Sequence, residues 1–513
     1  MPPTPITTSS SNASRDNGPP SVVTHGGFAG EEGWSLQFHG FFRAPMRIGM
    51  GKRDNPAAGQ SATTFHYPLV PDDQYFSWQH TNHSHRDWAE LYFTYGNGTV
   101  SGTVGIEAFN FTNAAWNNTD AQMGISQAFV TWNPNLHLHG AKLEWKIGSI
   151  SDRYGEMGMY DAGEYDTYLM GRTHVMGETL AGSYDVSDDW TVKLAHGLGV
   201  KRPDPGVYNR SRFTIVNHAH AGLAWNGKAE LGLHYMNAFA REEDRDKSDL
   251  IPPDVGGPLE NPKDGSLTVT GADVRFAQGQ FGYLYAGFSH VSGKDSIVVG
   301  PAFEVIHADG GGYYELGVVD NYWDGPNRAS NGNGSVDSIA AQYEFSLANL
   351  ILQMNDPEAE FYGEGQDIYL KLYGMYNMVK SDDPDMDGRK KLKYGADVAF
   401  SALPWFVVAG RYDRVQPNDE VPEQSFGIFS PRVTFRSTWV TREEITLQYS
   451  RYLYNQRTCD DPAQPTKCVQ PAAAGPTPDG FGATWEASGT DKRGAPEQRP
   501  DVNVVQLSAS MWW

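Results

Sequence analysis

The sequence predicts an all-β fold, a transmembrane antiparallel β-barrel of about 18 strands with short periplasmic turns and long extracellular loops. Three observations predict it. Apolar and polar side chains alternate along many short segments, and tight turns alternate with long polar connections. The segment 501–513, D-V-N-V-V-Q-L-S-A-S-M-W-W, has one apolar and one polar face and ends on an aromatic ring. Such a strand is typical of the closing strand of an outer-membrane barrel, whose terminal ring lies in an interfacial aromatic girdle.

The period-two alternation gives each strand a lipid face and a lumen face. In segment 34–48 the even positions are mostly apolar, whereas the odd positions include two arginines. Segment 84–95 repeats the pattern, with an apolar face that comprises Ala89, Leu91, Phe93 and Tyr95. In the last strand we expect lipid to contact Val505, Leu507, Ala509, Met511 and Trp513, and the lumen to contact Gln506, Ser508, Ser510 and Trp512.

Turn signals separate the expected strands. Short turns are predicted at Asn97-Gly98, 187–189, Asn226-Gly227 and 401–404, and long connections at 51–83, 241–265, 294–335 and 456–500. The expected strands are 35–49, 84–96, 99–111, 125–133, 142–151, 177–186, 189–200, 213–225, 228–240, 267–276, 281–293, 336–346, 366–379, 391–401, 405–414, 426–436, 443–454 and 501–513. Segment 347–365 is too long for a periplasmic turn and is mildly helical.

Composition excludes several classes of protein. The chain has 513 residues and a mean hydropathy of −0.51. No run reaches the roughly 18–20 apolar residues of a helical membrane span. Acidic residues outnumber basic ones 62 to 40, which argues against a nucleic-acid partner. Aromatic residues make up 12% of the chain, a share that suits two interfacial girdles.

One barrel accounts for nearly the whole chain. We expect residues 34–513 to form it and residues 1–33, which have almost no large apolar side chains, to be a disordered tail. Residues 1–20 show no charged segment followed by an apolar core, so we expect no signal peptide within this chain. The sequence has no nucleophile elbow, phosphate loop or HExxH motif, and we expect no enzymatic activity.

Two cysteines occur, and they lie close together. Cys459 and Cys468 belong to one Pro- and Asp-rich loop. A local disulfide formed in an oxidising compartment is therefore expected, and two unpaired thiols are the alternative.

Signals for metal binding are weak. The segment D-P-D-M-D-G places Asp383, Asp385 and Asp387 as in the start of a calcium loop, but the twelfth position is Tyr394 rather than glutamate. A solvated loop is the favoured interpretation, and a structural calcium ion is the alternative. Three pairs of histidines two residues apart each share a strand face but lack a third zinc ligand: His83 and His85, His137 and His139, and His218 and His220.

Aromatic rings at inward positions point to a sugar as the solute. Their place in the period-two alternation, or the sequence around them, predicts that Phe41, Trp88, Trp439 and Trp512 point inward. The apolar face of a pyranose stacks on such rings, and its hydroxyl groups form their stronger hydrogen bonds with charged partners. Arg43 follows Phe41 by two residues on the same face, and Glu90 follows Trp88 in the same way. The alternative is that these rings belong to girdles or pack against an infolded loop.

A set of short motifs resembles the maltoporin family, the maltooligosaccharide-specific channels of the outer membrane. The motifs are F-H-G-F-F-R at 38–43, W-A-E-L at 88–91, W-N-N-T-D at 116–120, W-K-I-G-S-I-S-D-R-Y-G-E-M-G-M-Y-D at 145–161, A-E-L-G-L-H-Y at 229–235, S-T-W-V-T-R-E-E-I at 437–445 and M-W-W at 511–513. They follow the order of the family over nearly the whole chain.

The resemblance implies a homotrimer of barrels, each with an aromatic slide down one wall and a flanking polar track for sugar hydroxyl groups. The slide would comprise Phe41, Trp88, Trp439 and Trp512, with Trp116 reaching over from a neighbouring subunit. The polar track would comprise Arg43 and Glu90 and, in the infolded third loop, Arg153, Glu156 and Asp161.

The chain departs from the family pattern at two places. Thr268 stands at the slide position of the strand expected at 267–276, so the slide is expected to be interrupted there. Gly163 stands where the family has its constriction tyrosine.

The sequence therefore predicts an outer-membrane channel for the facilitated diffusion of maltodextrin-type oligosaccharides, which move between weak sites along the slide. Its expected partners are these sugars and the lipid of the membrane. One alternative is a general diffusion porin, which the two departures favour. Another is a secreted soluble glycan-binding β-protein, which would not need lipid-facing alternation.

Overall fold

The computed structural model confirms a barrel of 18 antiparallel strands. It describes residues 33–50, 87–109, 122–153, 172–201, 214–240, 265–294, 334–355, 366–381, 388, 390–416, 419, 425–437, 443–454 and 502–512. The strands are β1 (Ser35–Met50), β2 (Trp88–Gly96), β3 (Val100–Phe109), β4 (Gln122–Trp132), β5 (Ala141–Arg153), β6 (Arg172–Asp185), β7 (Trp190–Lys201), β8 (Thr214–Trp225), β9 (Ala229–Ala240), β10 (Gly265–Gln278), β11 (Gly282–Lys294), β12 (Gly334–Ser346), β13 (Asp367–Ser381), β14 (Lys390–Leu403), β15 (Phe406–Gln416), β16 (Phe426–Arg436), β17 (Glu444–Tyr454) and β18 (Val502–Trp512).

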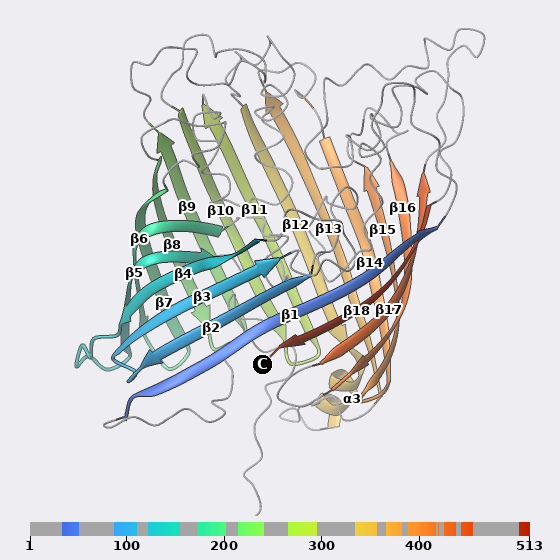
Figure 1. Ribbon diagram of the computed structural model, residues 1–513, viewed down its shortest axis with the longest axis horizontal. Helices are drawn as coiled ribbons and strands as arrows, with labels where there is room; N and C mark the ends of the chain where they lie inside the picture. The colour runs from blue at the N-terminus through green and yellow to red at the C-terminus, as the bar shows by residue number, and fades with distance from the viewer. Residues whose placement is uncertain are drawn as a thin grey trace, which may run out of the picture.

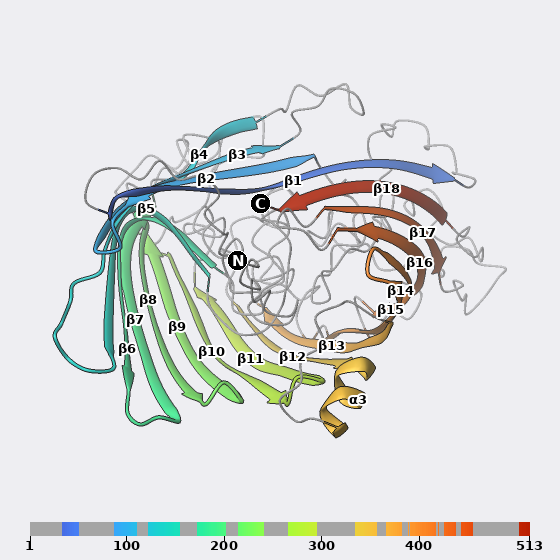
Figure 2. The same ribbon diagram turned by 90° about the horizontal axis from the view of Figure 1, so that it is seen from below.

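The sheet closes on itself between its first and last strands. Each strand pairs with the next along the chain, and β1 pairs with both β2 and β18. The strands therefore surround one interior, and β1 to β4 are more strongly tilted than β9 to β13 (Figures 1 and 2). Closure gives every strand a neighbour on both sides, as a sheet that crosses hydrocarbon requires, although β4 pairs with β5 only over residues 128–132.

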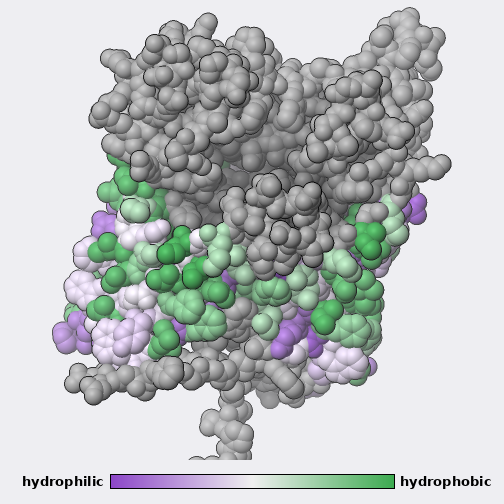
Figure 3. All heavy atoms as spheres, in the orientation of Figure 1, coloured by the Kyte–Doolittle hydropathy of each residue, from purple (hydrophilic) through white to green (hydrophobic). Residues whose placement is uncertain are grey.

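The alternation predicted from the sequence is present in the structure. Along β1, Leu36, Phe38, Met46 and Ile48 are exposed, whereas Phe41 and Arg43 are buried. The same division continues around the barrel, and hydrophobic side chains form a band on the face seen in Figure 3. An apolar exterior around a closed sheet is the architecture of a bacterial outer-membrane barrel, in which the band contacts lipid.

Short connections join alternate strands at one rim, which we call the short-connection rim. Asn226 and Gly227 link β8 to β9 with φ angles of 43° and 67°, the positive values that a type I′ hairpin turn requires. The Asn97 side chain accepts hydrogen bonds from the backbone N–H groups of Thr99 and Val100, which fixes the turn between β2 and β3. The opposite, long-connection rim has far longer connections, such as 241–264 and 295–333.

The helical tendency predicted after residue 346 is confirmed by helix α3 (Leu347–Asn355), which connects β12 to β13. Ser346 accepts a hydrogen bond from the backbone N–H of Asn349 at 3.2 Å, and Asp367 accepts one from that of Ala348 at 2.8 Å. These bonds cap the first turn. The helix lies at the short-connection rim, on the outer side of the barrel (Figures 1 and 2).

No helix in the described part of the chain is long and apolar enough to cross a membrane.

Several predictions concern residues outside the described ranges. They include the N-terminal tail up to residue 32, the pairing of Cys459 with Cys468, and the calcium loop of Asp383, Asp385 and Asp387. These remain predictions.

The lipid-facing band predicts a large effect of Ile339→Arg. Ile339 lies in the middle of β12 with half of its surface exposed. An arginine at the bilayer midplane of such a barrel costs about 2–4 kcal/mol. We expect a loss of that size in the free energy of unfolding in lipid vesicles, measured by denaturant titration. Asp188→Arg, in the exposed turn between β6 and β7, is the control and should change the free energy of unfolding little. Equal losses in the two variants would contradict the assignment of Ile339 to the lipid-facing side of the sheet.

Candidate functional site

The inner face of the barrel is the candidate site, and the strand register brings five of the predicted residues together there. In β1 and β2, Phe41 is paired with Glu90, and Arg43 with Trp88. Phe41 is also paired with Trp512 of β18. Since cross-strand partners share a face of the sheet, these residues form one patch beside the closure of the barrel.

The other predicted site residues are not tested. Arg153 is the last residue of β5, and its side chain is not described; nor is that of Trp512. The remaining predicted contacts lie outside the described residues, namely Trp116, Glu156, Asp161 and Trp439.

Glu90 is the centre of a hydrogen-bonded cluster in this patch. Its two carboxylate oxygens accept hydrogen bonds from Trp88 Nε1 and from the hydroxyl group of Tyr92, each at 2.8 Å. The ring of Tyr92 also stacks on that of His39, with centroids 5.0 Å apart. Phe41 and Trp88 are only 1% and 6% exposed. The aromatic rings and the carboxylate are therefore already engaged with one another.

Thr268 corrects one detail of the predicted slide. Along β10 the buried inward residues are Leu267, Val269 and Asp273, which are odd-numbered. Thr268 therefore lies on the outer face, where its hydroxyl group accepts a hydrogen bond from Asn237 Nδ2 at 2.9 Å. It is not a lumen position, so it cannot interrupt a slide.

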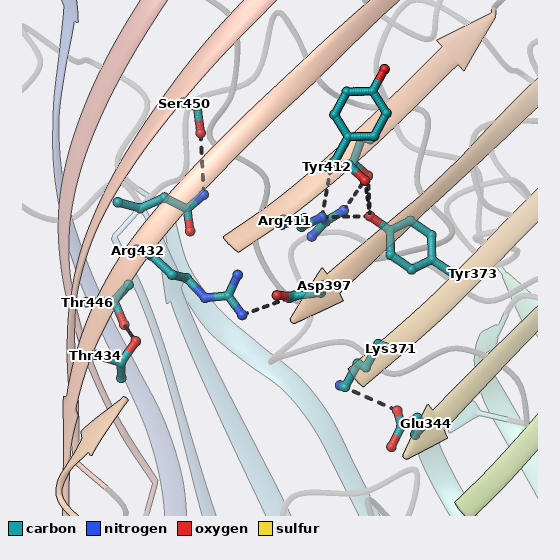
Figure 4. Close-up of polar contacts among 12 residues, drawn as sticks. Glu344, Lys371, Tyr373, Asp397, Arg411, Tyr412, Arg432, Thr434, Thr446 and Ser450 are labelled. Carbon is teal, nitrogen blue, oxygen red and sulfur yellow. Dashed lines mark hydrogen bonds and ion pairs between the residues drawn. The ribbon is translucent and has the colours of Figure 1, made fainter. Parts of the chain in front are cut away.

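A larger group of charged and hydrogen-bonding residues lies on the inner face of β12 to β16, and it was not predicted from the sequence. We call it the ion-pair ladder; it comprises Glu344, Lys371, Tyr373, Asp397, Arg411, Asp413 and Arg432 (Figure 4). Most of these residues are not aromatic, so the aromatic pattern of the sequence does not predict them. The segment R-Y-D at 411–413 did carry a signal, because its first and third residues share a face.

Arg411 and Asp413 form the best-defined pair of the ladder. Arg411 Nε and Nη2 donate to the two carboxylate oxygens of Asp413 at 2.8 and 2.9 Å. The hydroxyl group of Tyr373 donates to Asp413 at 2.7 Å and accepts from Arg411 Nε at 3.0 Å (Figure 4). All three side chains are buried. This bidentate geometry holds the guanidinium group in one orientation on the wall.

Two further ion pairs extend the ladder across neighbouring strands. Arg432 Nη2 contacts Asp397 Oδ2 at 2.7 Å, although β15 lies between their strands. The pairing of Arg432 with Ala409 explains the reach, since alanine leaves room for the guanidinium group. Lys371 Nζ lies 3.4 Å from Glu344 on the adjacent strand. The ladder therefore presents both signs of charge in alternation.

A row of imidazole groups lies on the inner face of β8 to β10. His218 Nδ1 is 3.0 Å from His220 Nε2, and His220 Nδ1 is 3.1 Å from His234 Nδ1. His234 Nε2 contacts Asp273 Oδ1 at 2.7 Å. The pair His218 and His220 was recognised in the sequence, but His234 and Asp273 join it only through the register. Among the residues that the structure describes, no group of histidine, cysteine, aspartate and glutamate is arranged to hold a metal ion.

Glycines lie beneath several of the inward rings. A Cβ atom added to Gly105, Gly197 or Gly395 would stand within 3.0 Å of the side chain of Tyr92, His218 or Tyr373, respectively, closer than real Cβ atoms approach. Each glycine is the cross-strand partner of the ring that covers it. The rings therefore lie flat along the wall instead of projecting from it.

The inner face changes character toward the long-connection rim. There the inward side chains are apolar and at most 2% exposed. They are Val216, Met236, Leu267, Val269, Val291, Val336, Val415, Phe426, Ile428, Tyr452 and Val504. The inner face thus has an apolar tier near that rim and a charged tier deeper in the barrel.

No protein-family model matches the chain, and no curated protein matches its sequence. Among solved structures, the outer-membrane channel DcaP of Acinetobacter baumannii matches with 11% identity and a TM-score of 0.41, over 95% of this chain and 99% of that one. OccD3 of Pseudomonas aeruginosa matches with 9% identity and a TM-score of 0.40, over 98% of each chain. The anion-selective porin of Comamonas acidovorans matches with 8% identity and a TM-score of 0.40, over 94% of this chain and 100% of that one. Likeness at this level supports no transfer of solute, selectivity or assembly.

The glycines beneath the rings predict the effect of Gly197→Ala. The new methyl group would collide with the fully buried ring of His218. Overpacking of this kind costs about 1–3 kcal/mol, which we expect to lose from the free energy of unfolding in vesicles. Gly410→Ala is the matched control, because a Cβ atom there has no neighbour within 4 Å. If both variants unfold like the wild type, the rings do not lie against the wall as described.

Proposed function

We propose that the chain is a diffusion channel of the bacterial outer membrane for small hydrophilic solutes, rather than an enzyme. The observation that carries this proposal is a closed 18-stranded barrel with an apolar exterior and a charged inner face. Barrels of about 16–18 strands enclose an aqueous channel, whereas small barrels are filled by their own side chains. The inner face carries the ion-pair ladder, the histidine row and the cluster around Glu90, and most of their side chains are buried.

The ion-pair ladder supports a role in solute passage. Salt bridges inside a barrel contribute little net stability, because desolvation of the charges offsets their attraction. Fixed charges of both signs along a pore do influence which ions pass and how polar solutes orient. A conducting path must also pass the apolar tier, so conductance is the deciding measurement.

Single-channel recording in planar bilayers tests this function. We expect steps of constant conductance in potassium chloride. Asp413→Asn removes a negative charge beside Arg411 and should shift the reversal potential in a salt gradient toward that of chloride. One unit charge at roughly 7 Å in water contributes about 0.6 kcal/mol, or an about threefold change in the permeability ratio.

Asp188→Asn changes the same charge at the exposed turn between β6 and β7 and serves as the control. Heat-modifiable migration in gels confirms that each variant is folded. Folded protein without conductance would overturn the proposed function. Conductance with an unchanged reversal potential in Asp413→Asn would remove the ladder from the pathway.

Selectivity for maltodextrins is a second candidate function, and the register that pairs Phe41 with both Glu90 and Trp512, next to Trp88, favours it. The burial of Phe41 and Trp88 weighs against it, because a sugar can stack only on an accessible ring. A general diffusion channel therefore accounts for the described residues with fewer assumptions. Assembly as a homotrimer, which the maltoporin resemblance implies, also stays a prediction.

The sugar hypothesis predicts that Trp88→Ala weakens the block of ion current by maltohexaose. An aromatic contact contributes about 0.5–1.5 kcal/mol, so the apparent affinity should fall roughly two- to tenfold with little loss of ion conductance. Trp88→Phe keeps a ring but lacks the N–H group that binds Glu90, and it should retain most of the block. If maltohexaose does not block the wild-type channel, or blocks Trp88→Ala equally well, the aromatic slide is excluded.

A further inference from the structure

The outer face of β6 and β7 carries two polar side chains in the middle of the lipid-facing band. Along β6 the exposed residues Met176, Leu180 and Tyr184 define the outer face, and Glu178 shares their parity. Along β7, His196 shares the outer face with Leu194 and is exposed. In the strand register Glu178 is paired with Leu198, and His196 with Leu180, so the two polar residues are diagonal neighbours.

Both residues lie far from either end of their strands. Glu178 stands six residues after Arg172 and seven before Asp185. His196 stands six residues after Trp190 and five before Lys201. Seven residues at ~3.3 Å each, tilted by ~45°, rise about 16 Å along the membrane normal. An apolar band of about 25 Å therefore has these side chains near its middle.

Charged side chains on the outer face of other described strands avoid this depth. Asp337 is three residues from Gly334, where β12 begins. Arg414 is two residues from Gln416, where β15 ends, and Arg451 is three from Tyr454, where β17 ends. All three stand close to the long-connection rim. Glu178 is the exception, and its position requires a polar partner.

The protein itself satisfies part of this requirement. Trp145 Nε1 on β5 donates a hydrogen bond to Glu178 Oε2 at 2.8 Å. A carboxylate accepts several hydrogen bonds, and acyl chains supply no donor. The apolar residues around the pair are strongly exposed, with Met176 at 67% and Leu194 at 60%. A protein surface with donors and acceptors fits such a face better than lipid does.

We propose that this face, centred on Glu178 and His196, is the surface through which two copies of the chain meet about a two-fold axis in the membrane, a contact different from the homotrimer that the maltoporin resemblance implies. Charge complementarity identifies the partner as a second copy. The face carries one carboxylate and one imidazole, so a copy of it offers a donor for the carboxylate and an acceptor for the imidazole. Met176 and Leu194 pack around the polar contact. This inference rests on the proposed function only in placing the barrel in a membrane.

Site-specific photo-crosslinking tests the proposal on the full chain in its native membrane. Benzoylphenylalanine replaces Met176 at the proposed interface and, as the matched control, Ile339 on the outer face of β12. Irradiation should yield a product of twice the chain mass from position 176 only. Lipid adducts alone at position 176, or a crosslink to a different protein identified by mass spectrometry, would overturn the proposal.

A double variant provides an independent measurement. Glu178→Leu with His196→Leu should make the unheated oligomer dissociate to monomers at a lower temperature in semi-native gels. If the face contacted lipid, these substitutions would leave the oligomeric state unchanged and would stabilise the barrel. Conductance recorded on the same preparation separates this result from a failure of the proposed function, because under that function we expect each barrel to conduct by itself.

Discussion

The need to pair every backbone N–H and C=O group in hydrocarbon governs the whole structure. A sheet meets that need only by closing. Here it closes through the backbone hydrogen bonds between β1 and β18, where Arg43 is opposite Ser510. Closure then gives each strand two environments, lipid outside and the interior inside. The apolar band, the ion-pair ladder and the histidine row follow from this division, because alternate residues of every strand are committed to opposite faces.

Much of the fold could be read from the sequence because alternation is a local property. Each expected strand corresponds to a strand of the barrel, and the inward positions of Phe41, Arg43, Trp88 and Glu90 are correct. The helical tendency after residue 346 was also visible. Most boundaries differ by a few residues, since the end of a strand depends on its neighbour and on the turn as well as on its own side chains.

The site was less predictable because its contacts cross between strands. Tyr373 and Asp413 are 40 residues apart in sequence, and only the register of β13 to β15 brings them together. The same holds for Asp273, which completes the histidine row from β10. Thr268 was misplaced for a different reason: its inward neighbours near the long-connection rim, Leu267 and Val269, are apolar, so the alternation in this strand agreed with the family pattern in placing Thr268 inward.

The glycines beneath Tyr92, His218 and Tyr373 have a consequence for how the inner face interacts with a moving solute. A ring pressed against the backbone of the next strand has few rotamers available. A solute that touches such a surface does not have to immobilise it, so contact costs little conformational entropy on the side of the protein. For the proposed diffusion channel we therefore expect the charged tier to act as a rigid template, on which discrimination between solutes would depend on their shape and charge.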